Sequence, residues 1–377
     1  MTSEGAPPTR AKKSPLWTLS KWALALVAVG LLGRTLVNAD LRRVVELLRG
    51  LGPKALLLCV PAVFVLVLET LAWRTSLTPL RRPLRYGGLA QVRLATEGVL
   101  MSLPGGVVLA EWLMPLLLRD KCGLPIAEGA AATAARKWLV MRSHGVYIAI
   151  SAVLGWGFLA ARSRAMIGIE GLPIVVLASA LMPFGAAVAM ELAMSRGAVA
   201  KRTWGLLARL PSRRLSSWLE GQRHAFEATD GQFSRIVNEG RATSLAGTAL
   251  FVGAWLLESV EAWVIARALG APLGFTEVLA FEAGLSLVRS LVFFAPSGVG
   301  VQDMGYVAFF GSMGVPDAAA IGGAFVVVKR AREIVWILVG WFFVATYMRK
   351  GAHPIAEVSL DPAAEASPPR DPGVDHP

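Results

Sequence analysis

Charge is scarce in this sequence. Charged residues make up 17% of the 377-residue chain, whereas they make up about a quarter of an average soluble domain. Hydrophobic residues make up 55%, and the mean hydropathy is +0.55. A soluble protein of this length would need more polar surface to cover its core. The composition therefore predicts an integral membrane protein with no soluble catalytic domain, whose function is carried out within or at the bilayer.

Residues that usually build catalytic or metal sites are also few. Cys59 lies in an apolar run and Cys122 in a predicted loop, so neither a disulfide framework nor a zinc spacing is present. The sequence contains no glycine-rich phosphate loop with its lysine and no nucleophile elbow. We therefore expect no cofactor, no metal, no catalytic residue and no ATP-driven mechanism in this chain, which we do not interpret as an enzyme. The four histidines are scattered: His144, His224, His353 and His376.

Acidic residues are outnumbered, and the formal net charge is +12. Most lysines and arginines flank apolar runs, where the positive-inside rule and anionic headgroups explain them. We therefore expect membrane lipids, including anionic headgroups at the cytoplasmic leaflet, as partners, and no nucleic acid. Enzymes of a lipid pathway are further candidate partners. The location predicted by this pattern is the cell inner (plasma) membrane, crossed several times.

The apolar runs predict an all-α transmembrane bundle of about eight spans. We divide the chain into a basic cytoplasmic N-terminus (1–16), a first membrane half (17–194), a basic amphipathic cytoplasmic segment (195–244), a second membrane half (245–350) and a disordered tail (351–377). A cleavable signal ending near Ala39 is an alternative for the first run. An amphipathic helix is expected over Asp40–Gly50. The expected spans are Trp17–Val37, Ala55–Trp73, Trp138–Ala160, Leu172–Met194, Leu245–Leu269, Val278–Ala295 and Ala318–Tyr347.

Two proline–glycine breaks interrupt the apolar segments. Around the first, Leu103–Gly106, the flanking stretches are too short to cross roughly 30 Å of hydrocarbon at about 1.5 Å per residue. Broken backbone at membrane depth is tolerated only when protein buries it or it lines a wet cavity. We therefore predict a broken or re-entrant helix pair here, and a second at Pro296–Gly300.

The surroundings of the two breaks are alike. An acid, Glu111 or Asp303, stands seven residues after the proline of its break, and a second proline follows the first after 21 or 20 residues. Broken helices at matching positions in two halves are typical of inverted-repeat transporters with the substrate site between them. We expect the two breaks to approach each other around a cavity that Glu111 and Asp303 face. Coincidence in a Gly/Pro/Ala-rich chain is the alternative.

Ionisable side chains inside apolar runs cost about 2.5–3.5 kcal/mol each on insertion, so each needs a partner or a purpose. Spacing predicts that Arg93 pairs with Glu97, and that Glu282 shares a helix face with Arg289. We interpret Glu69 as interfacial, and expect Lys329, Arg330 or Arg332 to reach a lipid phosphate or a carboxylate. Structural pairs or snorkelling side chains are the alternatives. The candidate substrate-binding or coupling residues are Glu97, Pro104, Gly105, Gly106, Glu111, Glu282, Arg289, Pro296, Gly298, Gly300, Asp303 and Arg330.

These segments resemble a known family. Leu68–Arg74, Arg93 with Glu97–Val99, and Leu103–Gly106 with Glu111 are similar to the lysylphosphatidylglycerol synthase transmembrane region. Pro296–Asp303, Gly314-Val315 and Lys329–Glu333 are similar to its hopanoid-associated branch. The chain departs from the family pattern at Ser102, where asparagine is common, and at Asp303, where glutamate is common.

The resemblance implies a flippase-like protein that moves or handles a lipid between leaflets, such as a hopanoid, another isoprenoid lipid or a phospholipid. The 27 residues after Lys350 are too few for the aminoacyltransferase domain of the bifunctional synthases. Two alternatives remain: an enzyme with its site in the membrane, acting on a lipid, and a non-catalytic accessory subunit of a lipid-modifying pathway.

Overall fold

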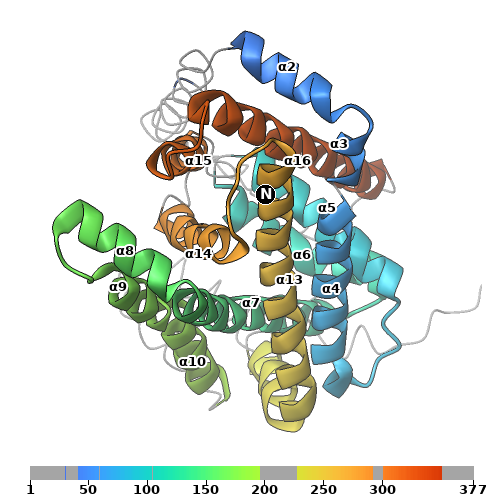
Figure 1. Ribbon diagram of the computed structural model, residues 1–377. Coiled ribbons are helices and arrows are strands. Elements are labelled where there is room, and N and C mark those ends of the chain that lie inside the picture. The colour runs from blue at the N-terminus through green and yellow to red at the C-terminus, as the bar shows by residue number, and fades with distance from the viewer. Residues whose placement is uncertain are drawn as a thin grey trace, which may run out of the picture.

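The computed structural model describes residue 30 and residues 41–58, 60–103, 105–195, 227–291 and 300–349. Within these ranges the regular elements are all helices, which confirms the all-α fold class (Figure 1). Several predictions fall outside the described residues: the cytoplasmic N-terminus, the first span, most of the basic segment 195–244, the tail, and the residues Pro104, Pro296 and Gly298.

The helices follow one another in two series. The first series is α2 (Leu41–Leu51), α3 (Lys54–Leu57), α4 (Val60–Ser76), the short 3₁₀ helix η1 (Thr78–Leu80), α5 (Tyr86–Ser102), α6 (Gly106–Cys122), α7 (Ile126–Leu154), α8 (Trp156–Ile167), α9 (Leu172–Ser179) and α10 (Leu181–Ser195). Residues 227–239 are also helical. The second series is α13 (Arg241–Ala268), α14 (Phe275–Leu291), α15 (Val301–Ser312) and α16 (Ala318–Arg349).

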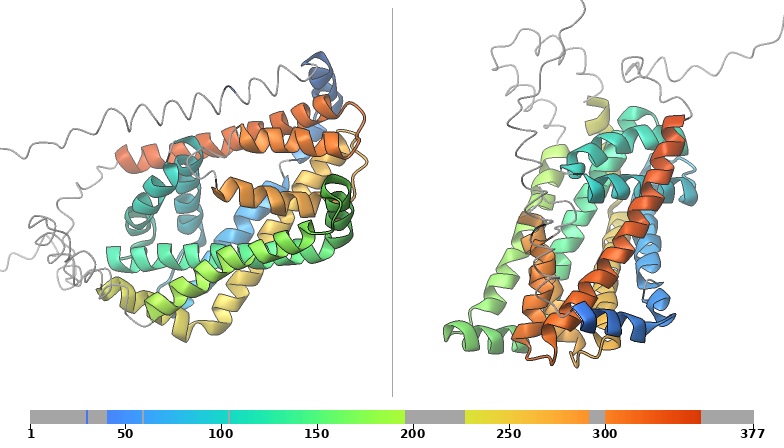
Figure 2. Two further views of the ribbon diagram at one scale, coloured as in Figure 1. Left: turned by 90° about the vertical axis from the view of Figure 1, so that its left-hand side faces the viewer. Right: turned by 90° about the horizontal axis from the view of Figure 1, so that it is seen from above.

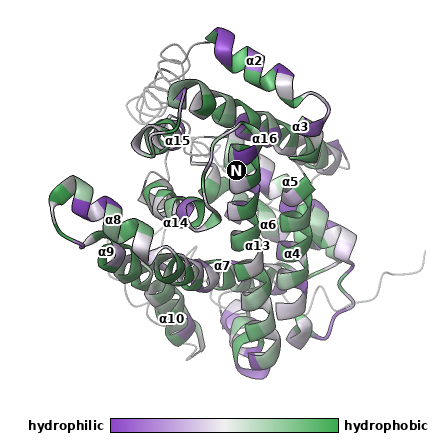
Figure 3. Cartoon of the chain, viewed as in Figure 1, coloured by the Kyte–Doolittle hydropathy of each residue, from purple (hydrophilic) through white to green (hydrophobic). Residues whose placement is uncertain are grey.

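The amphipathic helix expected over Asp40–Gly50 is confirmed as α2. Val44 and Leu51 are buried, while Arg42 and Arg43 pair with Glu46 on the exposed face. The long helices run in roughly one direction, and α2 and α8 lie across them at the same end of the bundle (Figure 2). Figure 3 shows polar and apolar residues together on α2 and α8, whereas apolar residues dominate the long helices. This placement suits helices that lie in a membrane interface.

The first predicted break is present. Helix α5 ends at Ser102, Gly105 has a φ of +70°, and α6 starts at Gly106. A Cβ at Gly106 would lie 2.7 Å from the Leu100 carbonyl oxygen, so only glycine lets the chain turn back here. Helices α5 and α6 pack against each other as a hairpin. At the second break α14 ends at Leu291 and α15 begins at Val301, after Gly300 with a φ of +84°.

Two expected spans have different boundaries in the structure. The span expected at Trp138–Ala160 is wrong at both ends: α7 begins at Ile126, and the chain bends by 71° into α8 after Leu154. At the bend, a Cβ on Gly155 would lie 2.5 Å from Ala280 Cβ, so glycine allows α14 to approach closely. The charges near Lys329 do not interrupt the last segment, because α16 is continuous over 32 residues.

By length and composition, three helical segments in the described part of the chain could cross a membrane: Leu172–Met194, Arg241–Ala268 and Ala318–Arg349. The bent pair α7–α8 raises this number to four. The expected total of about eight spans remains a prediction. The number three counts only helices that are long and apolar throughout. It leaves out short half-helices on either side of a break and helices that carry several charges.

The similarity between the two breaks extends to the packing. The series α4–α5–α6–α7 has the same order of elements as α13–α14–α15–α16, with a break in the middle of each. Helix α4 packs against α13, while α5 packs against α16 and α14 against α7. Each half therefore places its first broken helix against the last long helix of the other half, as expected for two related units.

Candidate functional site

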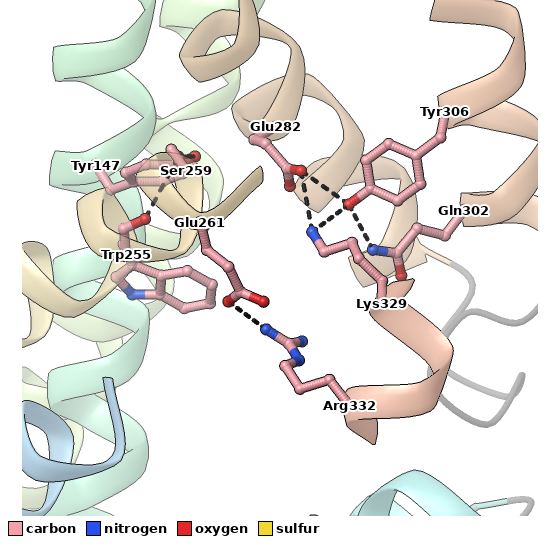
Figure 4. Close-up of polar contacts among 9 residues, drawn as sticks. All are labelled: Tyr147, Trp255, Ser259, Glu261, Glu282, Gln302, Tyr306, Lys329 and Arg332. Carbon is pink, nitrogen blue, oxygen red and sulfur yellow. Dashed lines mark hydrogen bonds and ion pairs between the residues drawn. The ribbon is translucent and has the colours of Figure 1, made fainter. Parts of the chain in front are cut away.

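Buried charges of α16 meet acids from three other helices. Lys329 Nζ lies 3.1 Å from Glu282 Oε1 on α14 and 2.7 Å from the Tyr306 hydroxyl on α15. Arg332 forms an ion pair with Glu261 on α13. Figure 4 shows Lys329 pointing toward Glu282 and Tyr306, while Arg332 points toward Glu261. These contacts confirm that the bases of this helix reach neighbouring carboxylates.

Asp303 is held by several donors at once. Its Oδ1 accepts hydrogen bonds from Arg330 Nε at 3.0 Å and Nη2 at 2.7 Å, and its Oδ2 accepts one from the Gly300 backbone N–H at 2.8 Å. Arg330 also pairs with Glu333 one turn further along α16. The carboxylate thus caps the first turn of α15, whose unpaired N–H groups favour a negative charge.

In the first half, Arg93 pairs with Glu69 on α4, and Arg136 Nη2 on α7 lies 3.9 Å from the same carboxylate. The direct ion-pair partner of Arg93 is therefore Glu69, which the packing of α5 against α4 brings to it, while Glu97 on its own helix interacts with Arg93 electrostatically. The side chain of Glu69 is buried within the protein, and its interfacial position stays a prediction. Glu282, which was expected to share a helix face with Arg289, pairs with Lys329. The side chain of Arg289 is not among those that the structure describes.

Glu111 is the counterpart of Asp303, but its surroundings are more open. Its Oε1 lies 3.3 Å from Lys137 Nζ, and about a third of its side chain is exposed. The two acid–base pairs have nearly the same separation in sequence, 26 residues for Glu111–Lys137 and 27 for Asp303–Arg330. This correspondence supports a repeat in which the acid after each break pairs with a base on the next long helix.

A small cavity lies where the two halves meet. Its volume is ≈ 60 Å³. By the roughly 15 Å³ that one water requires, it could hold about four waters or a small polar group, but not a whole lipid. Two helices from each half line it: α4 and α5 from the first, α13 and α16 from the second. Its polar lining consists of Arg93, Glu97, Glu258 and Arg332, and Ala62, Val65, Leu66, Leu94, Met101 and Trp336 complete the wall.

Both arginines of this cavity carry unused donors. Arg93 Nε and Arg332 Nε are buried without a hydrogen-bond partner in the described part of the chain. A buried donor without an acceptor costs about 1–3 kcal/mol or more when it is charged. The guanidinium-bearing side chains of Arg93 and Arg332 line a cavity with room for a small polar ligand, so their positive charge would stabilise a phosphate there.

The predicted site residues are only partly brought together. Glu97 lines the cavity, while Glu111 and Asp303 are absent from its described lining, so the expectation that they face a shared cavity is not met there. Gly105, Gly106 and Gly300 form the described edges of the two breaks. Sequence reasoning left three important residues off the list of candidates: Glu258, Lys329 and Arg332. Their signal was a charge inside an apolar run, which does not show which helix it faces.

An apolar groove of ≈ 520 Å³ lies between α7 and the α9–α10 pair, with Gly145, Ile174 and Phe184 among its lining residues. Because its lining is apolar, this groove is suited to contact the hydrocarbon chains of the bilayer. No group of acidic, histidine or cysteine side chains suited to a metal ion is found among the described residues.

Comparison with known proteins gives one family. Residues 21–340 match the family described as lysylphosphatidylglycerol synthase TM region. This match covers the two breaks, the cavity and the charged part of α16. It does not distinguish the hopanoid-associated branch from the rest of the family. Neither the curated proteins nor the solved structures show a significant match.

Proposed function

The chain belongs to the lysylphosphatidylglycerol synthase TM region family, and on that basis we propose that it moves a phosphate-bearing lipid between the leaflets of the inner membrane. The headgroup phosphate would be held at the cavity between the two halves. The hydrocarbon tails would stay outside it in the bilayer.

The observation that carries this proposal is the pair of arginines at the cavity. Arg93 comes from α5 and Arg332 from α16, so the two halves each contribute one guanidinium with an unpartnered Nε. Arginine suits this role because its planar group can donate two hydrogen bonds to phosphate oxygens while staying ionised. A phosphate bound here would use donors that are otherwise buried at a cost.

The location between halves also favours movement over static binding. In transporters built from related halves, the substrate site lies at their interface, and rocking of one half against the other exposes it alternately to the two sides. The cavity wall is shared among α4, α5, α13 and α16. A relative movement of the halves would therefore change its access without unfolding either one.

The test is leaflet exchange of a fluorescently labelled phosphatidylglycerol in vesicles that contain the purified protein. We expect exchange above that of protein-free vesicles, and a loss of roughly tenfold or more in Arg332→Ala, because one charge-assisted contact contributes about 1.5–3 kcal/mol. Arg42→Ala, which alters an exposed arginine on α2, is the matched control and should exchange lipid normally.

Two results would contradict the proposal. Exchange that equals protein-free vesicles for labelled phosphatidylglycerol, phosphatidylethanolamine and an isoprenoid phosphate would shift support to the enzyme or accessory-subunit alternatives. Normal exchange by folded Arg332→Ala and Arg93→Gln would remove the phosphate site from the mechanism. Elution as a single peak in size-exclusion chromatography identifies the folded variants.

A further inference from the structure

The two acids of the cavity lack partners of their own. Glu97 on α5 and Glu258 on α13 line the cavity from opposite halves. Within the described part of the chain neither takes part in a hydrogen bond or an ion pair, whereas Glu69, Glu261 and Glu282 each have a base as partner. These two carboxylates are therefore the ones that remain available to a ligand.

Charge balance points in the same direction. Among the described side chains that form the internal ion pairs or line the cavity, acids outnumber bases by two, as seven less five. The acids are Glu69, Glu97, Glu258, Glu261, Glu282, Asp303 and Glu333, and the bases are Arg93, Arg136, Lys329, Arg330 and Arg332. Uncompensated charge in a low-dielectric interior is costly, so an array of this kind stabilises added positive charge.

The charged and titratable groups around Glu97 and Glu258 set the electrostatic environment in which either acid would bind a positive charge. Glu258 interacts electrostatically with Arg93 on α5, Arg332 on α16, Glu261 on its own helix and Tyr147 on α7. Glu97 interacts with Arg93 on its own helix. Beyond these, Glu69 on α4 and Glu282 on α14 are acids already paired with bases. Glu258 thus interacts with both arginines that the proposed phosphate would contact, and Glu97 interacts with Arg93.

We propose that Glu97 and Glu258 form an intramembrane proton-binding site, and that proton binding there is coupled to lipid movement. This inference rests on the proposed function, since it assigns an energy source to the same cavity. The reaction is an acid–base equilibrium in which a carboxylate takes a proton from water on one side and releases it on the other. No covalent bond other than the O–H bond forms or breaks.

Coupling follows from the shared arginines. A lipid phosphate on Arg93 or Arg332 would cancel positive charge near the acids, which strengthens their hold on a proton. By linkage, a proton on either acid strengthens the hold on the phosphate by the same factor. Lipid and proton would therefore bind and move together, and a proton gradient would drive the lipid in the direction of proton flow.

The experiment uses vesicles of phosphatidylethanolamine, phosphatidylglycerol and cardiolipin that hold the full-length protein and a trapped pH dye. Exchange of labelled phosphatidylglycerol is measured with an acidic exterior and with equal pH on the two sides, at both pH values. We expect the gradient to accelerate inward movement together with proton uptake, with an inward accumulation of up to about tenfold per pH unit when one proton accompanies each lipid.

Glu97→Gln and Glu258→Gln are the decisive variants, because each removes the titrating group and keeps the shape. Both should lose the response to the gradient and the proton uptake while still eluting as a single folded peak in size-exclusion chromatography. Glu46→Gln on α2, an exposed carboxylate, is the matched control and should respond like the unaltered protein. If one variant fails to fold, the gradient response of the unaltered protein still tests proton coupling, and the other variant tests the site.

The outcomes separate this inference from the proposed function. No exchange at any pH overturns both. Exchange that ignores the pH gradient leaves lipid movement standing and overturns proton coupling. A response that disappears when choline replaces sodium, at an unchanged pH gradient, would assign the two carboxylates to a sodium ion and likewise overturn the proton site. A gradient response that persists in both folded variants would move the site away from Glu97 and Glu258.

Discussion

At the scale of single residues, Asp303 and Glu111 occupy equivalent positions after the two breaks, but their ion pairs differ in burial and therefore in their contribution to stability. The sequence predicts that neutralising either acid abolishes lipid movement and leaves the folded protein in the membrane. The contacts now predict a difference in stability: Asp303→Asn removes the charge that faces Arg330 in a buried site, which costs about 3–5 kcal/mol. Glu111→Gln affects a half-exposed pair worth about 1 kcal/mol or less.

The measurement for this pair is thermal unfolding in detergent beside the leaflet-exchange assay. A clear fall in the unfolding temperature for Asp303→Asn alone would support a structural role for that acid. Equal unfolding temperatures for the two variants would show that the buried pair contributes less than its geometry implies. Loss of exchange in well-folded Glu111→Gln would instead give that acid a part in transport.

Arg330 uses its fork to hold two acids at once. Two nitrogens donate to Asp303 and a third pairs with Glu333, an arrangement that a lysine cannot reproduce with one ammonium group. We expect Arg330→Lys to lower stability and activity less than Arg330→Ala, and more than a change at exposed Arg42. Unfolding temperature and exchange rate measured side by side test the order. Identical behaviour of the lysine and alanine variants would contradict it.

At the scale of elements, α5 and α16 approach closely at two glycines. A Cβ on Gly340 would lie 2.7 Å from Gly98 Cα, so the helices touch through their backbones. Gly340→Ala is expected to destabilise the protein by about 1–3 kcal/mol through overpacking. In Gly157→Ala on α8, where a Cβ has nothing within 4 Å, the change should be neutral or stabilising by up to about 1 kcal/mol.

Unfolding curves of the two glycine variants in the same detergent test this prediction. The contact joins the two halves beside the cavity, so Gly340→Ala should also slow lipid exchange if the halves move against each other there. A variant that unfolds at the normal temperature would show that α5 and α16 can separate without cost.

At the scale of the whole molecule, topology is the open prediction. The concentration of basic residues predicts that the N-terminus, the segment 195–244 and the tail all face the cytoplasm. A cysteine placed at Ser216, with Cys59 and Cys122 replaced by serine, should resist a membrane-impermeant maleimide in intact cells and react after permeabilisation. Ready labelling in intact cells would contradict this orientation.

The pairing of halves gives the molecule its functional centre. The cavity, the ion pairs Arg93–Glu69 and Arg332–Glu261, and the close helix contact all occur where α4 and α5 meet α13 and α16. The bulk of the molecule on either side is apolar packing, such as that around Trp73, whose indole N–H donates to the Ala132 carbonyl at 2.9 Å. A change in the relation of the halves therefore acts first on the buried charges.

The sequence by itself determined the helical membrane class, the amphipathic helix α2, the first broken helix pair and the family. These properties depend on local features: long apolar runs, an apolar face with a helical period, and a proline–glycine break whose backbone could not be left exposed to lipid. It also predicted that the bases of α16 would reach a lipid phosphate or a carboxylate, because an unpaired charge in hydrocarbon is costly.

The tertiary structure alone decided which acid serves which base. Arg93 pairs with Glu69, 24 residues before it, and Arg332 with Glu261, 71 residues before it. Spacing along one helix gives a choice of partners within that helix, but the packing of α4 against α5 and of α13 against α16 places other acids closer. The cavity depends on that packing as well, since four helices distant in sequence must meet before Glu97 and Glu258 are left facing two arginines.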